Sequence, residues 1–265
     1  MKPLLYALAG ICLLSAFIKP RTVNTFVPPG TVAINDSLFI DKTEVCNFDW
    51  LEYEAWIVQK YGHMSAEHQA MLPDTLIWRK KLSYNEPYVE FYYRHPAYHK
   101  YPVVGISYEQ AVAYCKWRSE RVYEKLCLHK KQQNISLNYR LPSIAEWEFC
   151  SNNASNIPWA TKGRNEKGVA QLNCINANTK VVHGKDTVFE NADVTTPVQS
   201  YTKNAFGAYN MIGNVAEMVL EKGICKGGSW THRLEDCRPG KNMPYTVPEP
   251  WLGFRCVCIV RQTHS

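Results

Sequence analysis

The signals for regular secondary structure are unevenly distributed along this chain. Two helix-capping boxes and an aromatic-rich amphipathic stretch occur before residue 150, whereas after Cys150 clusters of Asn and Gly alternate with short β-prone pieces. Such clusters favour turns, so only short strands fit the second half. The chain has 265 residues and no internal repeat. We therefore expect one loop-rich α+β domain, with a few helices early and short strands late.

Five segments carry the local predictions. Asn47–Tyr61 is amphipathic and predicts a helix, and the sequences SYEQ at 107–110 and SIAE at 143–146 are capping boxes that each open a helix. Gly30–Ile40 predicts strand structure around a central turn. Residues 62–101 are rich in Tyr and His, and we expect them to form an irregular surface insertion.

The N-terminus predicts export from the cytosol. Lys2 precedes an apolar run that ends at Ile18, shorter than the roughly 20 residues that span a bilayer comfortably. This pattern is typical of a secretory signal peptide. We predict that residues 1–19 are a signal peptide or an uncleaved membrane anchor, that 20–29 are a linker, and that 30–262 are the folded domain. Contact with a membrane would come through the N-terminal segment if it is not cleaved.

Composition and cysteine usage exclude several classes of protein. With 46% hydrophobic and 12% aromatic residues, the chain is not disordered. The net charge of +6 comes from basic residues mixed with acidic ones, so we expect no nucleic-acid partner. Nine of the ten cysteines follow the N-terminal segment, and none forms a CxxC pair. In an exported chain this usage predicts disulfides rather than a zinc ribbon, with at least one cysteine left over.

Four segments occur in a specific order: YPVVGISYEQAVAYCKW (101–117), YRLPSIAEWEF (139–149), NAFGAYNMIGNVAEM (204–218), and KGGSW followed by GFRC (226–256). Together they resemble the formylglycine-generating enzyme family, also called the sulfatase-modifying-factor domain. The resemblance covers about residues 27–260, and four ordered motifs are far more specific than one. It implies a C-type-lectin-like formylglycine-generating-enzyme fold with little regular secondary structure.

The loop from Asn210 to Glu217 predicts a calcium site. Asn210 and Glu217 offer side-chain oxygens, and Gly213 and Val215 offer carbonyls between them. Calcium accepts several such oxygens in flexible geometry. The resemblance implies the same, because in the family this loop holds a structural calcium at the four matching positions. The alternative is that Asn210 and Glu217 only bond to nearby backbone groups.

The resemblance also implies a second calcium site. In the family it uses an Asn, the carbonyl of the next residue, and an acidic residue before a TAPV sequence. Asn178 and Thr179 match the first two positions, and residues 195–198 match the later sequence. Glu190 is the candidate acid and Asp193 the alternative, because the loop between them departs in length from the family pattern.

The turn after GGSW decides the chemistry. Active members of the family place cysteines two and seven residues past the aromatic of this turn, where they bind Cu(I) and oxidise a substrate cysteine to formylglycine. Counted from Trp230, these positions are His232 and Cys237, and Ser229 keeps the adjacent hydroxyl. An imidazole cannot supply the second soft, anionic ligand, so we do not expect bound Cu+. Ser229, His232 and Cys237 would carry any remaining catalysis, while Cys225 could instead bond to Cys237.

Two functions from different classes remain. The missing thiolate favours a non-catalytic binding or scaffold module in the periplasm or cell envelope, with a protein or peptide partner. The VPPG and IDKTEV sequences near the start of the domain resemble those of domains in bacterial gliding-motility and secretion machineries. The alternative is a divergent formylglycine-generating oxidase that acts on a sulfatase cysteine, or another oxygen-dependent enzyme of the family.

The resemblance further implies a disulfide between Cys115 and Cys256. Family members with a cysteine in AYC-x-W often pair it with the cysteine in GFRC, and both motifs are present here. Cys258, which shares a strand face with Cys256, is the alternative partner.

Overall fold

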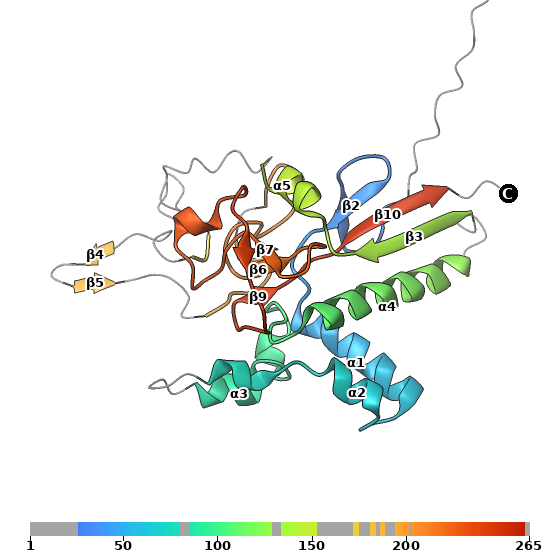
Figure 1. Cartoon of the computed structure of the whole chain (residues 1–265), viewed down its shortest axis with the longest axis horizontal. Helices are drawn as coiled ribbons and strands as arrows, with labels where there is room; N and C mark the ends of the chain where they lie inside the picture. The colour runs from blue at the N-terminus through green and yellow to red at the C-terminus, as the bar shows by residue number, and fades with distance from the viewer. Residues whose placement is uncertain are drawn as a thin grey trace, which may run out of the picture.

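The computed structural model describes residues 26–79, 85–128, 134–152, 172–174, 181–183, 186–188, 194–201 and 203–262. The expected signal peptide or anchor and residues 20–25 of the expected linker lie outside these ranges. Within the ranges, no helix combines the length and apolar character needed to cross a membrane. Figure 1 shows short strands between a few helices, with long irregular connections.

The first sheet joins the two ends of the described chain. Its strand order is β1-β2-β10-β3, with every neighbouring pair antiparallel. Val257 lies opposite Ile40, so these two side chains share one face, and Cys258 and Phe39 share the other. Its strands are β1 (Thr31–Ala33), β2 (Leu38–Asp41), β3 (Ile135–Arg140) and β10 (Val257–Gln262). Strands β1 and β2 form a hairpin that matches the predicted strand segment Gly30–Ile40 and ends one residue beyond it.

Three helices begin where the sequence predicts them: α1 (Asn47–Tyr61), α4 (Tyr108–Cys127) and α5 (Ile144–Asn152). At the start of α4, Ser107 Oγ accepts from Gln110 N at 3.2 Å, and Gln110 Oε1 accepts from Ser107 N at 2.7 Å. This reciprocal pair satisfies two backbone donors that a helix otherwise leaves open. The same arrangement opens α5.

The main core lies between α1, α4 and one face of the first sheet (Figure 1). Trp50 of α1 stacks on Tyr114 of α4 with ring centroids 5.4 Å apart, and both rings meet Phe254 edge-on. On the other face of the sheet, Val257 packs in a second core with Trp147 of α5. Burying aromatic rings of this size supplies much of the driving force for folding.

The expectation of a surface insertion at 62–101 is wrong. The described part of this segment contains α2 (Ala66–Met71), the 3₁₀ helix η1 (Thr75–Trp78), α3 (Glu86–Phe91) and the 3₁₀ helix η2 (Pro96–Tyr98). Trp78 and Tyr92 are both 2% exposed and lie in the same core cluster. The aromatic residues of this segment therefore contribute to the core, and Tyr92 satisfies its hydroxyl by donating to Pro102 O at 2.8 Å.

The second sheet is built from very short strands in the order β8-β7-β6-β9. It lies near the centre of the molecule, and the separate β4–β5 hairpin extends to one side (Figure 1). This agrees with the prediction of short strands late in the chain. The hairpin consists of β4 (Val181–His183) and β5 (Asp186–Val188). The strands of the second sheet are β6 (Ala216–Met218), β7 (Ile224–Lys226), β8 (Met243–Pro244) and β9 (Leu252–Gly253).

Candidate functional site

The turn that follows β7 packs closely against Cys237. Gly227 and Gly228 have positive φ angles of 85° and 66°, which favour glycine. A Cβ on Gly228 would lie 2.2 Å from Cys237 Sγ, and one on Gly227 would lie 2.7 Å from Met211 O. The GGSW sequence is therefore required by close packing: only glycine lets the backbone approach the Cys237 sulfur.

Ser229 and His232 form a hydrogen-bonded pair. Ser229 Oγ lies 2.6 Å from His232 Nδ1 and 3.0 Å from Thr231 Oγ1. The imidazole packs edge-on against Trp251, with ring centroids 4.9 Å apart. Burial lowers the pKa of His232, although Asp236 acts in the opposite direction. The imidazole is therefore neutral at pH 7.

Cys237 lies in a closed, apolar environment. It is the last residue of the 3₁₀ helix η4 (Leu234–Cys237), it is fully buried, and its Sγ donates to Arg233 O at 3.3 Å. Its thiol is also hydrogen-bonded to the Cys174 side chain. This bond and burial together raise the pKa of Cys237. Because the thiolate is the form that binds copper or attacks a substrate, the neutral thiol is poorly prepared for either role.

The structure brings Ser229 into contact with both of the other predicted catalytic residues. Its Oγ bonds to His232, and its backbone bonds to the Cys237 thiol, which is also bonded to Cys174, a residue that sequence reasoning missed. Cys225, the alternative partner considered from the sequence, lies in a different core and donates to Met243 O at 3.4 Å. The cysteine count signals that partners exist, but it does not say which sulfur atoms meet.

The predicted calcium loop is buried, and its two side-chain ligands differ. Asn210 has a positive φ of 49°, and its Nδ2 donates to Glu44 Oε2 at 3.2 Å. Asn210 Oδ1 is buried, with no hydrogen-bond partner among the described residues. Glu217 accepts from Arg255 at 2.6 and 2.7 Å and from Trp147 Nε1 at 2.7 Å. The first ligand therefore has an open oxygen, and the second is already ion-paired.

These groups fit a hard cation. Glu44 and Glu217 are both fully buried, and both interact with the guanidinium of Arg255. Burial, opposed by Arg255 and reinforced by Glu217, raises the pKa of Glu44 to about 8. The buried, unpartnered Asn210 Oδ1 is the hard oxygen donor that a cation would use here. Glu44 belongs to the IDKTEV sequence, but sequence reasoning missed it as a site residue because that sequence does not indicate which groups its side chain contacts.

The second predicted calcium site lies outside the described residues, since Asn178, Thr179 and Glu190 all fall there. It stays a prediction. Nearby, Asn173 is described: its Nδ2 donates to Val194 O at 3.0 Å, and its Oδ1 is buried without a partner in the described part of the chain. Among all the residues that the structure describes, no group of three or more His, Cys, Asp and Glu side chains is placed to hold a metal.

The predicted disulfide partners lie close together. Cys115 Sγ is 3.5 Å from Cys256 Sγ, and both residues are buried thiols. Burial and the hydrogen bond with Cys115 raise the pKa of Cys256. Cys258, the alternative partner, contacts Ile259 O at 3.9 Å instead. A covalent link between Cys115 and Cys256 stays a prediction.

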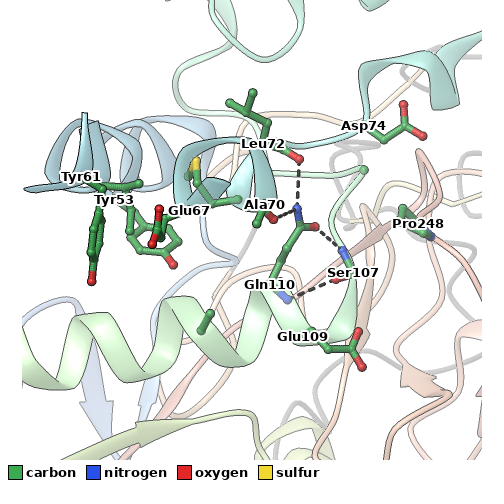
Figure 2. A pocket seen from close by; sticks show the side chains of 14 residues that line it. Tyr53, Tyr61, Glu67, Ala70, Leu72, Asp74, Ser107, Glu109, Gln110 and Pro248 are labelled. Carbon is green, nitrogen blue, oxygen red and sulfur yellow. Dashed lines mark hydrogen bonds between the residues drawn. The ribbon is translucent and has the colours of Figure 1, made fainter. Parts of the chain in front are cut away.

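A cavity of about 570 Å³ lies away from the GGSW turn, between α1, α2 and the first turns of α4. Figure 2 shows Gln110 at its wall, where Gln110 Nε2 donates to Ala70 O at 2.9 Å and to Leu72 O at 3.0 Å. None of the residues predicted to be catalytic or metal-binding lines this cavity. The side chain of Gln110 therefore serves both the helix cap and the connection from α2.

Comparison with known families gives a match over residues 9–260 to the "Sulfatase-modifying factor enzyme 1-like domain". This range includes all four sequence motifs and nearly the whole chain. The chain belongs to this family. The resemblance stated from the motifs, and the α+β fold with limited regular structure that it implies, are confirmed.

Several members of the sulfatase-modifying factor family are similar in sequence. The formylglycine-generating enzyme of Mus musculus is 31% identical over 186 residues, which are 59% of this chain and 44% of the mouse protein. An inactive C-alpha-formylglycine-generating enzyme 2 of Bos taurus is 25% identical over 181 residues, 59% of this chain and 50% of that protein. The chain thus spans about half or less of these relatives, one of which is named inactive.

Solved structures share the fold of this sulfatase-modifying factor domain. PvdO from Pseudomonas aeruginosa superimposes with a TM-score of 0.51 and 20% identity, covering 84% of this chain and 80% of PvdO. CarF gives a TM-score of 0.52 at 20% identity, covering 86% of this chain and 87% of CarF. At this identity the comparison concerns the fold alone.

Proposed function

We propose that this chain is a non-catalytic binding or scaffold module of the sulfatase-modifying factor family, exported to the cell envelope. The observation that supports it most directly is that the groups at the two expected copper positions are already hydrogen-bonded within the chain. His232 Nδ1 lies 2.6 Å from Ser229 Oγ, and the Cys237 thiol bonds to Arg233 O and Cys174. These bonds oppose a copper ion shared by the imidazole nitrogen and the thiol.

The protonation states of the two groups support the same conclusion. Burial keeps His232 neutral, and the raised pKa of Cys237 keeps its thiol protonated at neutral pH. Cu(I) is best held by two thiolates, and a buried thiol is a weak nucleophile. The proposal also agrees with the existence of a relative that is named inactive.

The partner that we propose is a protein or peptide in the cell envelope, such as a component of a gliding-motility or secretion machinery. The N-terminal segment would export the chain, or tether it to a membrane if that segment is not cleaved. No nucleic-acid partner is proposed, because the net charge of +6 arises from interspersed acidic and basic residues.

We propose in addition that calcium stabilises this module without taking part in chemistry. The ligands would be Asn210 Oδ1, the carbonyl oxygens of Gly213 and Val215, and Glu217. The open oxygen of Asn210 supports this assignment. Bound calcium would hold the loop before β6 in place.

An activity assay tests the proposed function. The full chain is incubated with Cu(I), oxygen and a Cys-x-Pro-x-Arg sulfatase peptide, and the product is measured by mass spectrometry beside an active formylglycine-generating enzyme. We expect no aldehyde above the level without protein. Aldehyde that forms with the wild type and disappears in Cys237→Ser would overturn the proposal and establish the oxidase instead.

A further inference from the structure

Two cysteines that are distant in the sequence meet beneath the GGSW turn. Cys174 belongs to the short described segment 172–174, and Cys237 ends η4. Both are fully buried and lie in one apolar cluster with Leu172 and Ile212. Within it, the Cys237 thiol is hydrogen-bonded to Cys174. The fold therefore places the two cysteine side chains in the same small buried cluster.

The packing around this pair holds it in place. A Cβ on Gly228 would come within 2.2 Å of Cys237 Sγ, so the turn covers that sulfur without a gap. On another side, Cys237 Sγ donates to the Arg233 carbonyl. Other buried cysteines occupy different clusters: Cys225 lies in the main core, and Cys150 of α5 lies in the second core. Cys174 is thus the described cysteine that shares a cluster with Cys237.

We propose that Cys174 and Cys237 form a disulfide bond, which removes the one cysteine retained at a copper position from metal chemistry. This inference deepens the proposed function, because it explains how the site is closed to copper. It assigns a role to Cys174 that neither the sequence motifs nor the comparisons give.

A disulfide suits this environment better than a metal does. Copper(I) between two thiolates carries a net negative charge, and a charge without polar partners is costly in an apolar cluster. A disulfide is neutral and apolar. Cys–Cys oxidation also suits an exported chain with many cysteines.

The bond would form by thiol–disulfide exchange with a small-molecule disulfide such as oxidised glutathione, before the cluster closes during folding. One protein thiolate attacks the glutathione disulfide and releases one glutathione thiol, and the second protein thiolate then displaces the other. The protein thiols lose two electrons, the glutathione disulfide gains them, and the two protons end on the released glutathione thiols. No metal or other oxidant is needed.

Peptide mapping tests the inference on the full chain, oxidised in a glutathione buffer and alkylated in denaturant without reductant. Trypsin releases Cys174 in peptide 168–180 and Cys237 in peptide 234–241, each with no second cysteine. We expect these two peptides to be joined, and to separate after reduction. Alkylation of both cysteines, or a link from Cys237 to Cys225, would overturn the proposal. Aldehyde formation does not enter this readout, so the proposed function can fail independently.

A thermal comparison gives a second readout. Cys174→Ala and Cys237→Ala should each lower the Tm of the oxidised chain by about 5–15 °C, as expected for loss of a disulfide in a domain of this size. The double variant should fall little further, and reductant should remove most of the difference from wild type. Cys225→Ala is the matched control, since it is equally buried and its effect should not depend on reductant. If the variants do not fold, the mapping of the wild type decides, and reductant-independent effects contradict the proposal.

Discussion

At the scale of single residues, Glu54 shows how a buried charge is retained. It lies in α1 and accepts hydrogen bonds from Tyr93 at 2.5 Å, Arg94 at 2.7 Å and His68 at 2.9 Å. Burial raises the pKa of Glu54, but the hydrogen bonds from these three side chains outweigh it, so the pKa is lowered overall. The carboxylate therefore links α1 to α2 and to the segment after α3.

The lowered pKa has a testable consequence for stability. An acid whose pKa is lower when folded contributes stability above its unfolded pKa and loses it as pH falls through the folded value. Glu54→Gln should therefore reduce the free energy of unfolding by about 2 kcal/mol at pH 7, near the value of a charge-assisted hydrogen bond. The difference in unfolding free energy between the wild type and Glu54→Gln should narrow as the pH drops below 4.5, the ordinary pKa of a glutamate side chain.

Urea unfolding at pH 7 and at acidic pH measures this difference. Glu86→Gln is the control, because Glu86 also pairs with an arginine but lies exposed on the surface. We expect little change in the control at either pH, since exposed ion pairs contribute little. A Glu54→Gln difference that is the same at both values would contradict the prediction.

At the scale of elements, helices that carry a local sequence signal could be predicted. Segments whose structure depends on contacts with distant parts of the chain could not. The capping boxes at Ser107 and Ser143 locate α4 and α5, because the cap is made within four residues. Residues 62–101 were misjudged because Trp78 and Tyr92 are buried by contacts that no local pattern records. A tyrosine-rich segment is compatible with either surface or core.

The loop before β6 carries the calcium prediction. Added calcium should raise the Tm of the wild type by about 5–10 °C at saturating concentration, because a ligand that binds only the folded state stabilises it. A chelator should reverse the change. Asn210→Gly removes the open oxygen but keeps a residue that tolerates a φ of 49°, so this variant should fold and lose most of the calcium response.

Asn210→Asp is the matched partner of that variant, since it keeps an oxygen at the same place and adds a charge. We expect it to retain or strengthen the response to calcium. An unchanged wild-type Tm in calcium and in chelator would remove the calcium assignment, and Glu217 would then have the structural role of an ion-pair partner alone.

At the scale of the whole molecule, Arg255 connects parts that are distant in sequence. It donates to Glu217 of β6, to the carbonyl of Asp41 at the end of β2, and to the carbonyl of Tyr209. These contacts link the first sheet, the second sheet and the start of the loop before β6. The GFRC motif signals that this arginine matters, but its partners come from three separate segments and are visible only in the folded chain.

Long-range contacts also explain why two residues of the candidate site could not be predicted from the sequence. Ser229, His232 and Cys237 could be located by counting from Trp230, because the motif fixes their spacing. Cys174 and Glu44 could not, since each reaches the site through a long-range contact. Local motifs therefore identified the site, whereas its chemistry depends on residues that the tertiary fold brings to it.

A double-mutant cycle on Arg255 and Glu217, measured in chelator so that calcium does not contribute, tests the central ion pair. Both side chains are at most 1% exposed and lie 2.6 Å apart. Arg255→Met should cost about 3–5 kcal/mol of unfolding free energy, because it leaves Glu217 buried without its counter-charge. Glu217→Gln in the same background should recover part of the loss, since it removes the stranded charge, so the double variant should be more stable than the sum of the single effects predicts. Arg255→Lys should not restore the wild type, because one ammonium cannot replace the guanidinium fork that reaches the carboxylate and two carbonyls. Additive losses in the cycle would show that Arg255 acts through packing alone and that its pairing with Glu217 does not hold the two sheets together.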